Sequence, residues 1–404
     1  MMSRIVYLLA DVANPRNRDR LGIDFLAGEG YDVTVLDLSG IVHPDLARDR
    51  SSDSEQRQRC PVHTVSDAGE LGRFLPLLAG ADLVMNFAES GLVTSRHLPV
   101  FRLLARAGTS YLVQFVNAFP GWKAGVGAAP RPPAVERLRR AAQRVRHARP
   151  VESVLTRVPP RMLGVTPPRF QVLGGRQCEG FGRLADADTR RIYAHAMDYE
   201  HYRRVRDENH EQREIAVFID EYLPYHPDII MMRVDPPMPP EPYYRCLRNL
   251  FDRVERELNL EVVIAACPHA DYRDKPEAFG GRRVEYFATA RLVAESRLVI
   301  AHRSTAINFA VLFGKPLMLT ATRQTYAHFS QTPYFNAFSA ALAKQIRFID
   351  DARAVDLDGV FEVDRAVYER YIEDFIKTRE SPDLPFWRIV LDALIEAEAL
   401  RPAA

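Results

Sequence analysis

Four polar residues stand directly after an apolar run, 298–301, and before a pattern of small and apolar residues that is typical of a helix. They are His302, Arg303, Ser304 and Thr305. Free N–H groups and the helix dipole attract anions to a helix N-terminus, so this pattern predicts a phosphate site. Ser304 or Thr305 can equally serve only as the cap of the helix, and both interpretations stay open at the level of sequence.

A histidine follows another predicted strand of the same half. His269 comes shortly after the apolar run 261–266. An imidazole in that place can donate a hydrogen bond to a phosphate or protonate a leaving group. The alternative is a loop histidine bonded to the backbone.

Carboxylates and a further histidine follow the predicted strand 215–219. Asp220 and Glu221 come first, and His226 follows the aromatic loop 222–225. The loop suits stacking on a base or a sugar, although packing of a surface loop explains it nearly as well. Because ligands of open α/β sheets bind outside the carboxyl ends of the strands, we expect these groups to converge on one site.

The first half offers its own carboxylates at predicted strand ends. Asp11 and Asn14 follow the first apolar run, and Glu89 and Ser90 follow the run 81–87. A sugar transfer with inversion needs a carboxylate that deprotonates the acceptor hydroxyl, and Asp11 or Glu89 can supply it. Each can also be an ordinary cap or loop residue.

Alternating strands and helices predict an α/β protein made of two Rossmann-like domains. We place the N-terminal domain at 1–210 and the C-terminal domain, with its closing helices, at 211–404. The strands predicted for the first domain are 4–10, 31–38, 81–87, 110–115 and 170–173. Those predicted for the second are 215–219, 261–266, 298–301 and one that follows Pro316. The predicted helices are 18–28, 68–78, 97–107, 133–149, 242–258, 284–295, 364–378 and 385–400, of which the last two can brace the domains.

Length and composition fit two soluble domains. The chain has 404 residues, and 47% of them are hydrophobic. Its net charge of +1 gives no general attraction to nucleic acid. The four cysteines lack the spacing of a zinc site or a disulfide framework, so we expect a cytoplasmic protein without a metal centre.

Several segments resemble GT-B glycosyltransferases, in particular bacterial transferases of surface and capsular polysaccharides that include the sialyl- and Kdo-transferases. The segments are 195–199 (HAMDY), 218–228 (FIDEYLPYHPD), 268–271 (PHAD) and 302–306 (HRSTA). The resemblance implies two Rossmann-like domains that face a central cleft, with a nucleotide-sugar donor on the second domain. It implies that His269, Ser304 and Thr305 hold the donor phosphate, with help from His226, His302 or Arg303. In that family a histidine precedes a proline, whereas here Pro268 precedes His269.

The stretch 133–149 is dense in arginine. A solvated helix is the ordinary interpretation. The functional one is attraction to an anionic lipid-linked saccharide or to anionic lipids, which would place the protein peripherally at the inner membrane face. No motif for nucleic-acid binding accompanies these arginines.

The sequence therefore predicts a metal-independent glycosyltransferase that moves a hexose or keto-sugar from a CMP- or UDP-linked donor to a surface glycan, with no cofactor besides this co-substrate. The base is assigned to Asp11 or Glu89, with Asp220 or Glu221 as substitutes, and His269 assists the leaving group. A sugar-nucleotide epimerase of the same fold and a non-catalytic protein that binds glycans or nucleotides are the alternatives.

Overall fold

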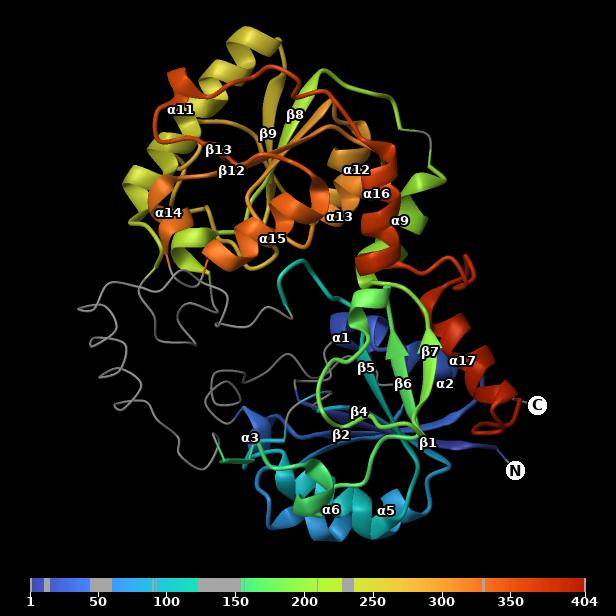
Figure 1. Ribbon diagram of the computed structural model, residues 1–404. Helices are drawn as coiled ribbons and strands as arrows, with labels where there is room; N and C mark the ends of the chain where they lie inside the picture. The colour runs from blue at the N-terminus through green and yellow to red at the C-terminus, as the bar shows by residue number, and fades with distance from the viewer. Residues whose placement is uncertain are drawn as a thin grey trace. The chain divides into compact units, whose positions relative to one another are not determined.

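The computed structural model contains two parallel β-sheets, each with helices on its faces (Figure 1). The larger sheet has the strand order β3-β2-β1-β4-β5-β6-β7 and the smaller one β10-β9-β8-β11-β12-β13. This confirms the two predicted Rossmann-like domains. The GT-B fold consists of two such domains. The structure describes residues 2–10, 15–43, 60–88, 91, 93–122, 154–155, 157–208, 210–226, 236–328 and 331–402.

Contacts divide the chain into two units. Unit 1 consists of Met1–Val116, Ala134–Met197 and Thr378–Ala404, and unit 2 of Asn117–Pro133 and Asp198–Lys377. The elements of unit 1 are β1 (Arg4–Leu9), α1 (Pro15–Arg20), α2 (Ile23–Gly28), β2 (Asp32–Asp37), α3 (Ser39–Val42), β3 (Val62–Thr64), η1 (Glu70–Phe74), α5 (Leu75–Ala79), β4 (Leu83–Phe87), α6 (Leu98–Ala107), β5 (Tyr111–Phe115), η3 (Pro160–Leu163), β6 (Phe170–Leu173), η4 (Arg176–Cys178), β7 (Arg190–Tyr193) and α17 (Phe386–Glu396).

The elements of unit 2 begin with α9 (Met197–Arg206), whose first residue the division assigns to unit 1. The others are β8 (Ile215–Ile219), η5 (Leu223–Tyr225), α11 (Pro240–Leu258), β9 (Glu261–Ala266), β10 (Val284–Tyr286), α12 (Thr289–Glu295), β11 (Leu298–Ala301), α13 (Ile307–Leu312), β12 (Leu317–Ala321), α14 (Arg323–Ala327), α15 (Thr332–Leu342), β13 (Arg347–Phe348), η6 (Ala352–Ala354), α16 (Arg365–Tyr371) and the π-helix η7 (Ile372–Ile376).

The sheet of unit 1 is buried on both faces. Along β1, Tyr7 and Leu9 pack into one core with α2, whereas Val6 and Leu8 pack into another with α5 and α6. A strand with two buried faces reads as a continuous apolar run, which is why the run at β1 was recognisable in the sequence.

The last helix, α17, completes the core of unit 1. Phe386 and Trp387 pack among the side chains on the α2 face of this sheet, and the Trp387 indole donates to the carbonyl of Arg20 at 3.0 Å. A Cβ at Gly22 would lie 2.2 Å from the Trp387 ring, and φ at Gly22 is +69°. The prediction placed the domains at 1–210 and 211–404; in the structure α17 packs with the N-terminal sheet because its apolar face fills that core, and Asp198–Lys377 belongs with unit 2.

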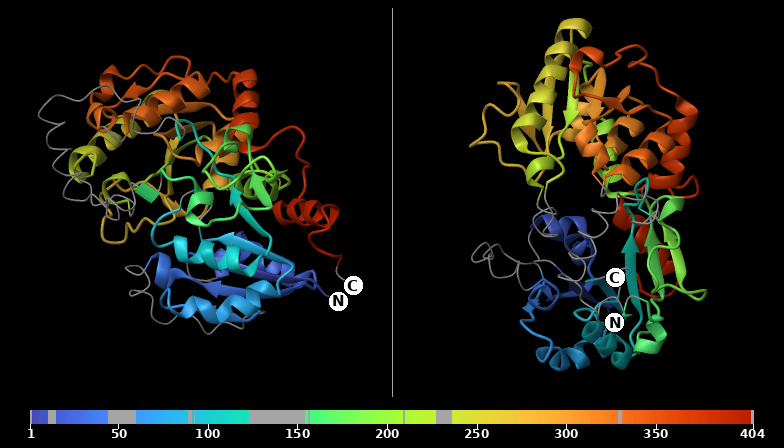
Figure 2. Two further views of the ribbon diagram at one scale, coloured as in Figure 1. Left: turned by 60° about the horizontal axis from the view of Figure 1, so that its bottom comes forward. Right: turned by 60° about the vertical axis from the view of Figure 1, so that its left-hand side comes forward.

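In unit 2, α11 covers one face of the six-stranded sheet, and α12, α13 and α16 lie on the other (Figures 1 and 2). The apolar face of α11 packs on β8 and β9, as its helical period predicts. The predicted helix 284–295 is wrong at its start. Val284–Tyr286 forms β10, which pairs in parallel with β9, and the helix begins only at Thr289.

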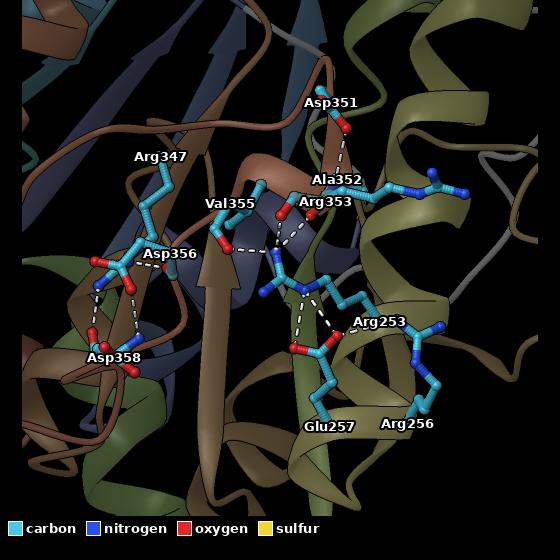
Figure 3. Close-up of polar contacts among 10 residues, drawn as sticks. All are labelled: Arg253, Arg256, Glu257, Arg347, Asp351, Ala352, Arg353, Val355, Asp356 and Asp358. Atoms are coloured by element: carbon cyan, nitrogen blue, oxygen red, sulfur yellow. Dashed lines mark hydrogen bonds and ion pairs between the residues drawn. The ribbon is translucent and has the colours of Figure 1, made fainter.

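One arginine of α11 holds the connection between β13 and α16 (Figure 3). The Arg253 guanidinium donates to the carbonyl of Ala352 at 2.6 Å and also to those of Arg353 and Val355. Its Nε donates to Glu257 at 2.9 Å. These bonds satisfy carbonyls at the end of η6, so Arg253 fixes this loop to α11.

We expect Arg253→Met to lower the free energy of unfolding by about 2 kcal/mol, because hydrogen bonds to a charged group are lost and carbonyls are left partly unsatisfied. Arg256→Met is the matched control: Arg256 is 66% exposed against 16% for Arg253, and it contacts the same Glu257. Its loss should cost under about 0.5 kcal/mol. Urea denaturation measures both, and equal losses would contradict the role given to Arg253.

Candidate functional site

The order of strands in unit 2 creates a switch point at its carboxyl edge. The chain runs from β8 to β9 and β10 on one side, then returns past β8 to β11 and β12 on the other. The loops after β8 and β11 therefore leave the sheet in opposite directions, which is where open α/β sheets bind ligands. These two loops carry most of the polar residues predicted to form the donor site.

Asp220 points into the unit. Its carboxylate accepts hydrogen bonds from the Tyr222 N–H at 2.9 Å, the Tyr272 hydroxyl at 2.8 Å and the Cys267 N–H at 3.3 Å. Burial raises the pKa of Asp220 to about 6, despite these bonds. Asp220 was predicted as a substitute base; in the structure its carboxylate is buried and joins the loop after β8 to the loop after β9.

Glu221 joins the two loops of the switch point. Its carboxylate accepts the backbone N–H of Arg303 at 2.6 Å, and its side chain is only partly buried. Of the two neighbouring carboxylates, Glu221 is thus the one that remains near the surface of this edge.

His302 is a core residue. It is 1% exposed. Its Nδ1 lies 2.8 Å from the Thr320 carbonyl and its Nε2 lies 3.0 Å from the Tyr243 hydroxyl. Burial lowers the pKa of His302, so the ring is neutral, with Nδ1 donating to the carbonyl and Nε2 accepting from Tyr243. His302 was predicted to help hold phosphate; in the structure its imidazole is buried and braces the end of β11 against β12.

The Arg303 side chain is held by unit 2 residues near α15. Its guanidinium lies 5.5 Å from the centre of the Tyr334 ring and donates to the Gln331 side chain. Tyr334 in turn lies 5.7 Å from the Phe119 ring. A stacked guanidinium keeps its charge and loses little freedom on binding an anion, so Arg303 is a preorganised cation.

Ser304 and Thr305 begin the turn into α13. The Ser304 hydroxyl accepts the Ala306 N–H at 3.2 Å, and Thr305 is exposed. The first contact is a local turn bond just before α13, whose N-cap is Ala306. The Ser304 hydroxyl can still donate a hydrogen bond. Phosphate binding by Ser304 and Thr305 remains a proposal.

The two other predicted histidines differ in exposure. His269 is exposed in the loop that follows β9, and His226 is partly buried at the end of η5. Lys275 connects the loop after β9 to η5. Its ammonium donates to the Asp271 carbonyl at 3.1 Å and lies 5.0 Å from the centre of the Tyr225 ring.

Sequence reasoning missed an aromatic residue at the carboxyl end of β10. Phe287 is 76% exposed and has φ +55°, a conformation that bulky residues seldom adopt. Tyr286 beside it accepts the Tyr272 N–H through its hydroxyl at 3.2 Å. An exposed, strained aromatic residue at a ligand-binding edge is a candidate for stacking on a planar group. The Tyr-Phe pair was the available signal, and it was hidden by reading 284–295 as one helix.

Four predicted residues of the first half lie outside the described residues. They are Asp11, Asn14, Glu89 and Ser90. The same holds for the arginine-rich stretch 133–149.

Within the described ranges, no group of three or more His, Cys, Asp or Glu side chains gathers as metal ligands would. No helix in those ranges is long and apolar enough to cross a membrane.

A second carboxylate of unit 2 titrates above its ordinary range. Asp198 accepts the Asn308 amide at 2.9 Å, and burial raises its pKa to about 6. Between about pH 4 and pH 6 the folded protein therefore binds more protons at Asp198 than the unfolded chain, so this residue's contribution to stability falls as the pH rises through that window.

We expect Asp198→Asn to remove this dependence and, above pH 7, to raise the free energy of unfolding by roughly 1–3 kcal/mol, since Asn can still accept from Asn308. Urea denaturation at pH 4.5 and pH 7.5, for wild type and variant, measures the difference. A variant that is less stable than wild type at pH 7.5 would show that the ionised carboxylate is favoured there.

No protein-family model matches the chain, and no curated protein does. Solved structures match along nearly its whole length at low identity. They include MurG of Acinetobacter baumannii (10% identity, 96% of this chain and 99% of that chain, TM-score 0.45), the calicheamicin glycosyltransferase CalG4 (13%, 99% and 98%, 0.48) and MnaA of S. aureus, determined with UDP (10%, 99% and 98%, 0.45).

Proposed function

We propose that this chain is a glycosyltransferase that binds a nucleotide-activated sugar on unit 2 and transfers the sugar to a hydroxyl of a surface glycan. The observation that carries the proposal is the switch point of the six-stranded sheet, where the Glu221 carboxylate and the Arg303 backbone N–H tie two loops together at 2.6 Å. Polar residues follow several strands at the carboxyl edge of this sheet, and Rossmann-like sheets bind nucleotides at that edge.

The donor's phosphate is assigned to Arg303, Ser304 and Thr305, with His269 and His226 as further donors. Arg303 supplies a fixed positive charge, which suits the recognition of phosphate oxygens. The base of the nucleotide is assigned to the exposed Phe287 ring. CMP-linked keto-sugars, which follow from the sialyl- and Kdo-transferase resemblance, and UDP-linked sugars are the donors that we propose.

The chemistry follows from these assignments. The acceptor oxygen forms a bond to the anomeric carbon while its proton passes to a carboxylate, Asp11 or Glu89 in this proposal. The bond between the anomeric carbon and the phosphate oxygen breaks, and the nucleotide leaves with an additional negative charge. Arg303 offsets that charge and His269 donates a hydrogen bond to the leaving phosphate, so the proposed mechanism needs no metal ion and no other cofactor.

A ligand screen tests the proposal and separates it from the alternatives. A saturating nucleotide at 100 times its dissociation constant stabilises a fold by about 2.7 kcal/mol, which a thermal shift detects. We expect a shift with CMP or UDP and their sugars. Turnover of a nucleotide sugar without any acceptor would indicate an epimerase, and a protein that no nucleotide stabilises would be a binding module of another kind.

The hydroxyl pair gives a specific prediction. We expect the double variant Ser304→Ala/Thr305→Ala to weaken nucleotide binding by about 1.5–3 kcal/mol, as for lost hydrogen bonds to a charged group, while stability falls by only roughly 1 kcal/mol. Calorimetric titration and urea denaturation of the same samples measure the two. A folded double variant with unchanged nucleotide affinity would limit both residues to capping α13.

A further inference from the structure

A surface patch of unit 1 lies over α6 and η3, two elements that lie side by side (Figures 1 and 2). Arg102 of α6 donates to the Leu163 carbonyl of η3 at 3.2 Å, which fixes the turn on the helix. Leu163 packs against the core that α6 covers. The neighbouring residues of the turn consequently face solvent.

Two aliphatic side chains are unusually exposed, one in η3 and one in the residues that lead into it. Met162 is 78% exposed, and Val154, whose carbonyl accepts the Arg157 N–H at 2.9 Å, is 58% exposed. Large apolar side chains at such exposure cost free energy in water unless a partner covers them.

Exposed arginines lie on the same two elements and in the residues that lead into η3. Arg102 and Arg106 are one helical turn apart on the exposed side of α6, whereas Arg161 lies within η3 and Arg157 lies shortly before it. Arg161 pairs with Asp186. The patch therefore carries the exposed charges of Arg102 and Arg106 on α6, and Met162 on η3, with Arg157 and Val154 in the residues that lead into η3.

We propose that this patch docks unit 1 on an anionic lipid surface. Aliphatic side chains that project among cations match a bilayer interface, where the apolar atoms enter the acyl boundary and the cations meet phosphate headgroups. Single-stranded nucleic acid is the weaker match, because its bases stack on aromatic side chains and the patch offers Met and Val instead. The patch is independent of the donor site on unit 2, so the inference does not depend on the proposed function.

Co-sedimentation with vesicles tests the docking. The full-length protein should bind vesicles of phosphatidylcholine with 30% phosphatidylglycerol and fail to bind vesicles of phosphatidylcholine alone, and 0.5 M NaCl should release most of it, because salt screens exposed charges. Absence of binding to the anionic vesicles at 0.05 M NaCl would overturn the proposal.

Variants locate the binding surface. Arg106→Glu/Arg157→Glu should weaken vesicle binding by about 25-fold or more, and Met162→Ser by roughly threefold. The matched controls lie on unit 2: Arg245→Glu/Arg365→Glu changes the net charge equally, and Phe361→Ser removes another exposed apolar side chain. The patch is supported if the control variants bind the vesicles as wild type does and the folded Arg106→Glu/Arg157→Glu variant does not. Equal losses in patch and control variants, or tighter binding to an RNA oligomer than to the vesicles, would overturn it.

Discussion

Turnover is expected to fall by about 100-fold or more when the acceptor-side base is removed, and this is the largest effect on activity that we foresee. The changes are Asp11→Asn and Glu89→Gln, at least one of which should have this effect while nucleotide affinity stays nearly constant. A lost general base lowers the rate of the chemical step without removing donor contacts. Steady-state kinetics with a saturating donor, together with calorimetric titration of the nucleotide, measure the two quantities.

His269→Ala belongs to the same experiment and should lower turnover on a similar scale, because an exposed histidine after β9 is assigned to the leaving phosphate. EDTA should change the rates little. Full activity in both carboxylate variants would assign the role of base to Glu221 instead, since the Asp220 carboxylate is buried and already accepts hydrogen bonds. Strict dependence on added Mg²⁺ or Mn²⁺ would contradict the metal-free mechanism.

Asp220→Ala should give the largest loss of stability, about 4 kcal/mol. The carboxylate accepts three hydrogen bonds in a buried position, and its removal leaves the Tyr272 hydroxyl and two backbone N–H groups without their acceptor. Urea denaturation with a check of the slope measures this loss.

Asp274→Ala, an exposed carboxylate of the neighbouring loop, is the matched control and should change stability by under about 0.5 kcal/mol. If Asp220→Ala kept wild-type stability but lost turnover, Asp220 would act in the reaction rather than in the support of the loops.

Much of the fold was predictable because its strands are buried on both faces. The bounds predicted for β6, β8, β9 and β11 agree with the structure. The edge strands escaped prediction. Arg190–Tyr193 carries two exposed arginines, and Val284–Tyr286 is only three residues long, so neither shows an apolar run.

The strands that precede the candidate residues were predictable, and the directions of the side chains that follow them were less so. The loops after β8 and β11 hold the expected polar residues. Neighbouring residues that look alike in the sequence nevertheless separate in the structure: Asp220 faces inward whereas Glu221 does not, and His302 is buried whereas Arg303 is not. Such differences depend on partners distant in the sequence, such as Tyr272 and Tyr243, which no local pattern identifies.

The return of α17 to the first sheet has a consequence for synthesis on the ribosome. Tyr7 and Leu9 pack in the same core as Phe386 and Trp387, which are translated much later. At 5–20 residues per second this delay is roughly 20–80 s. The segment Asp198–Lys377 can meanwhile collapse around its own sheet. The strands of unit 1 meanwhile expose one apolar face, so we expect nascent chains that end before α17 to bind ribosome-associated chaperones longest.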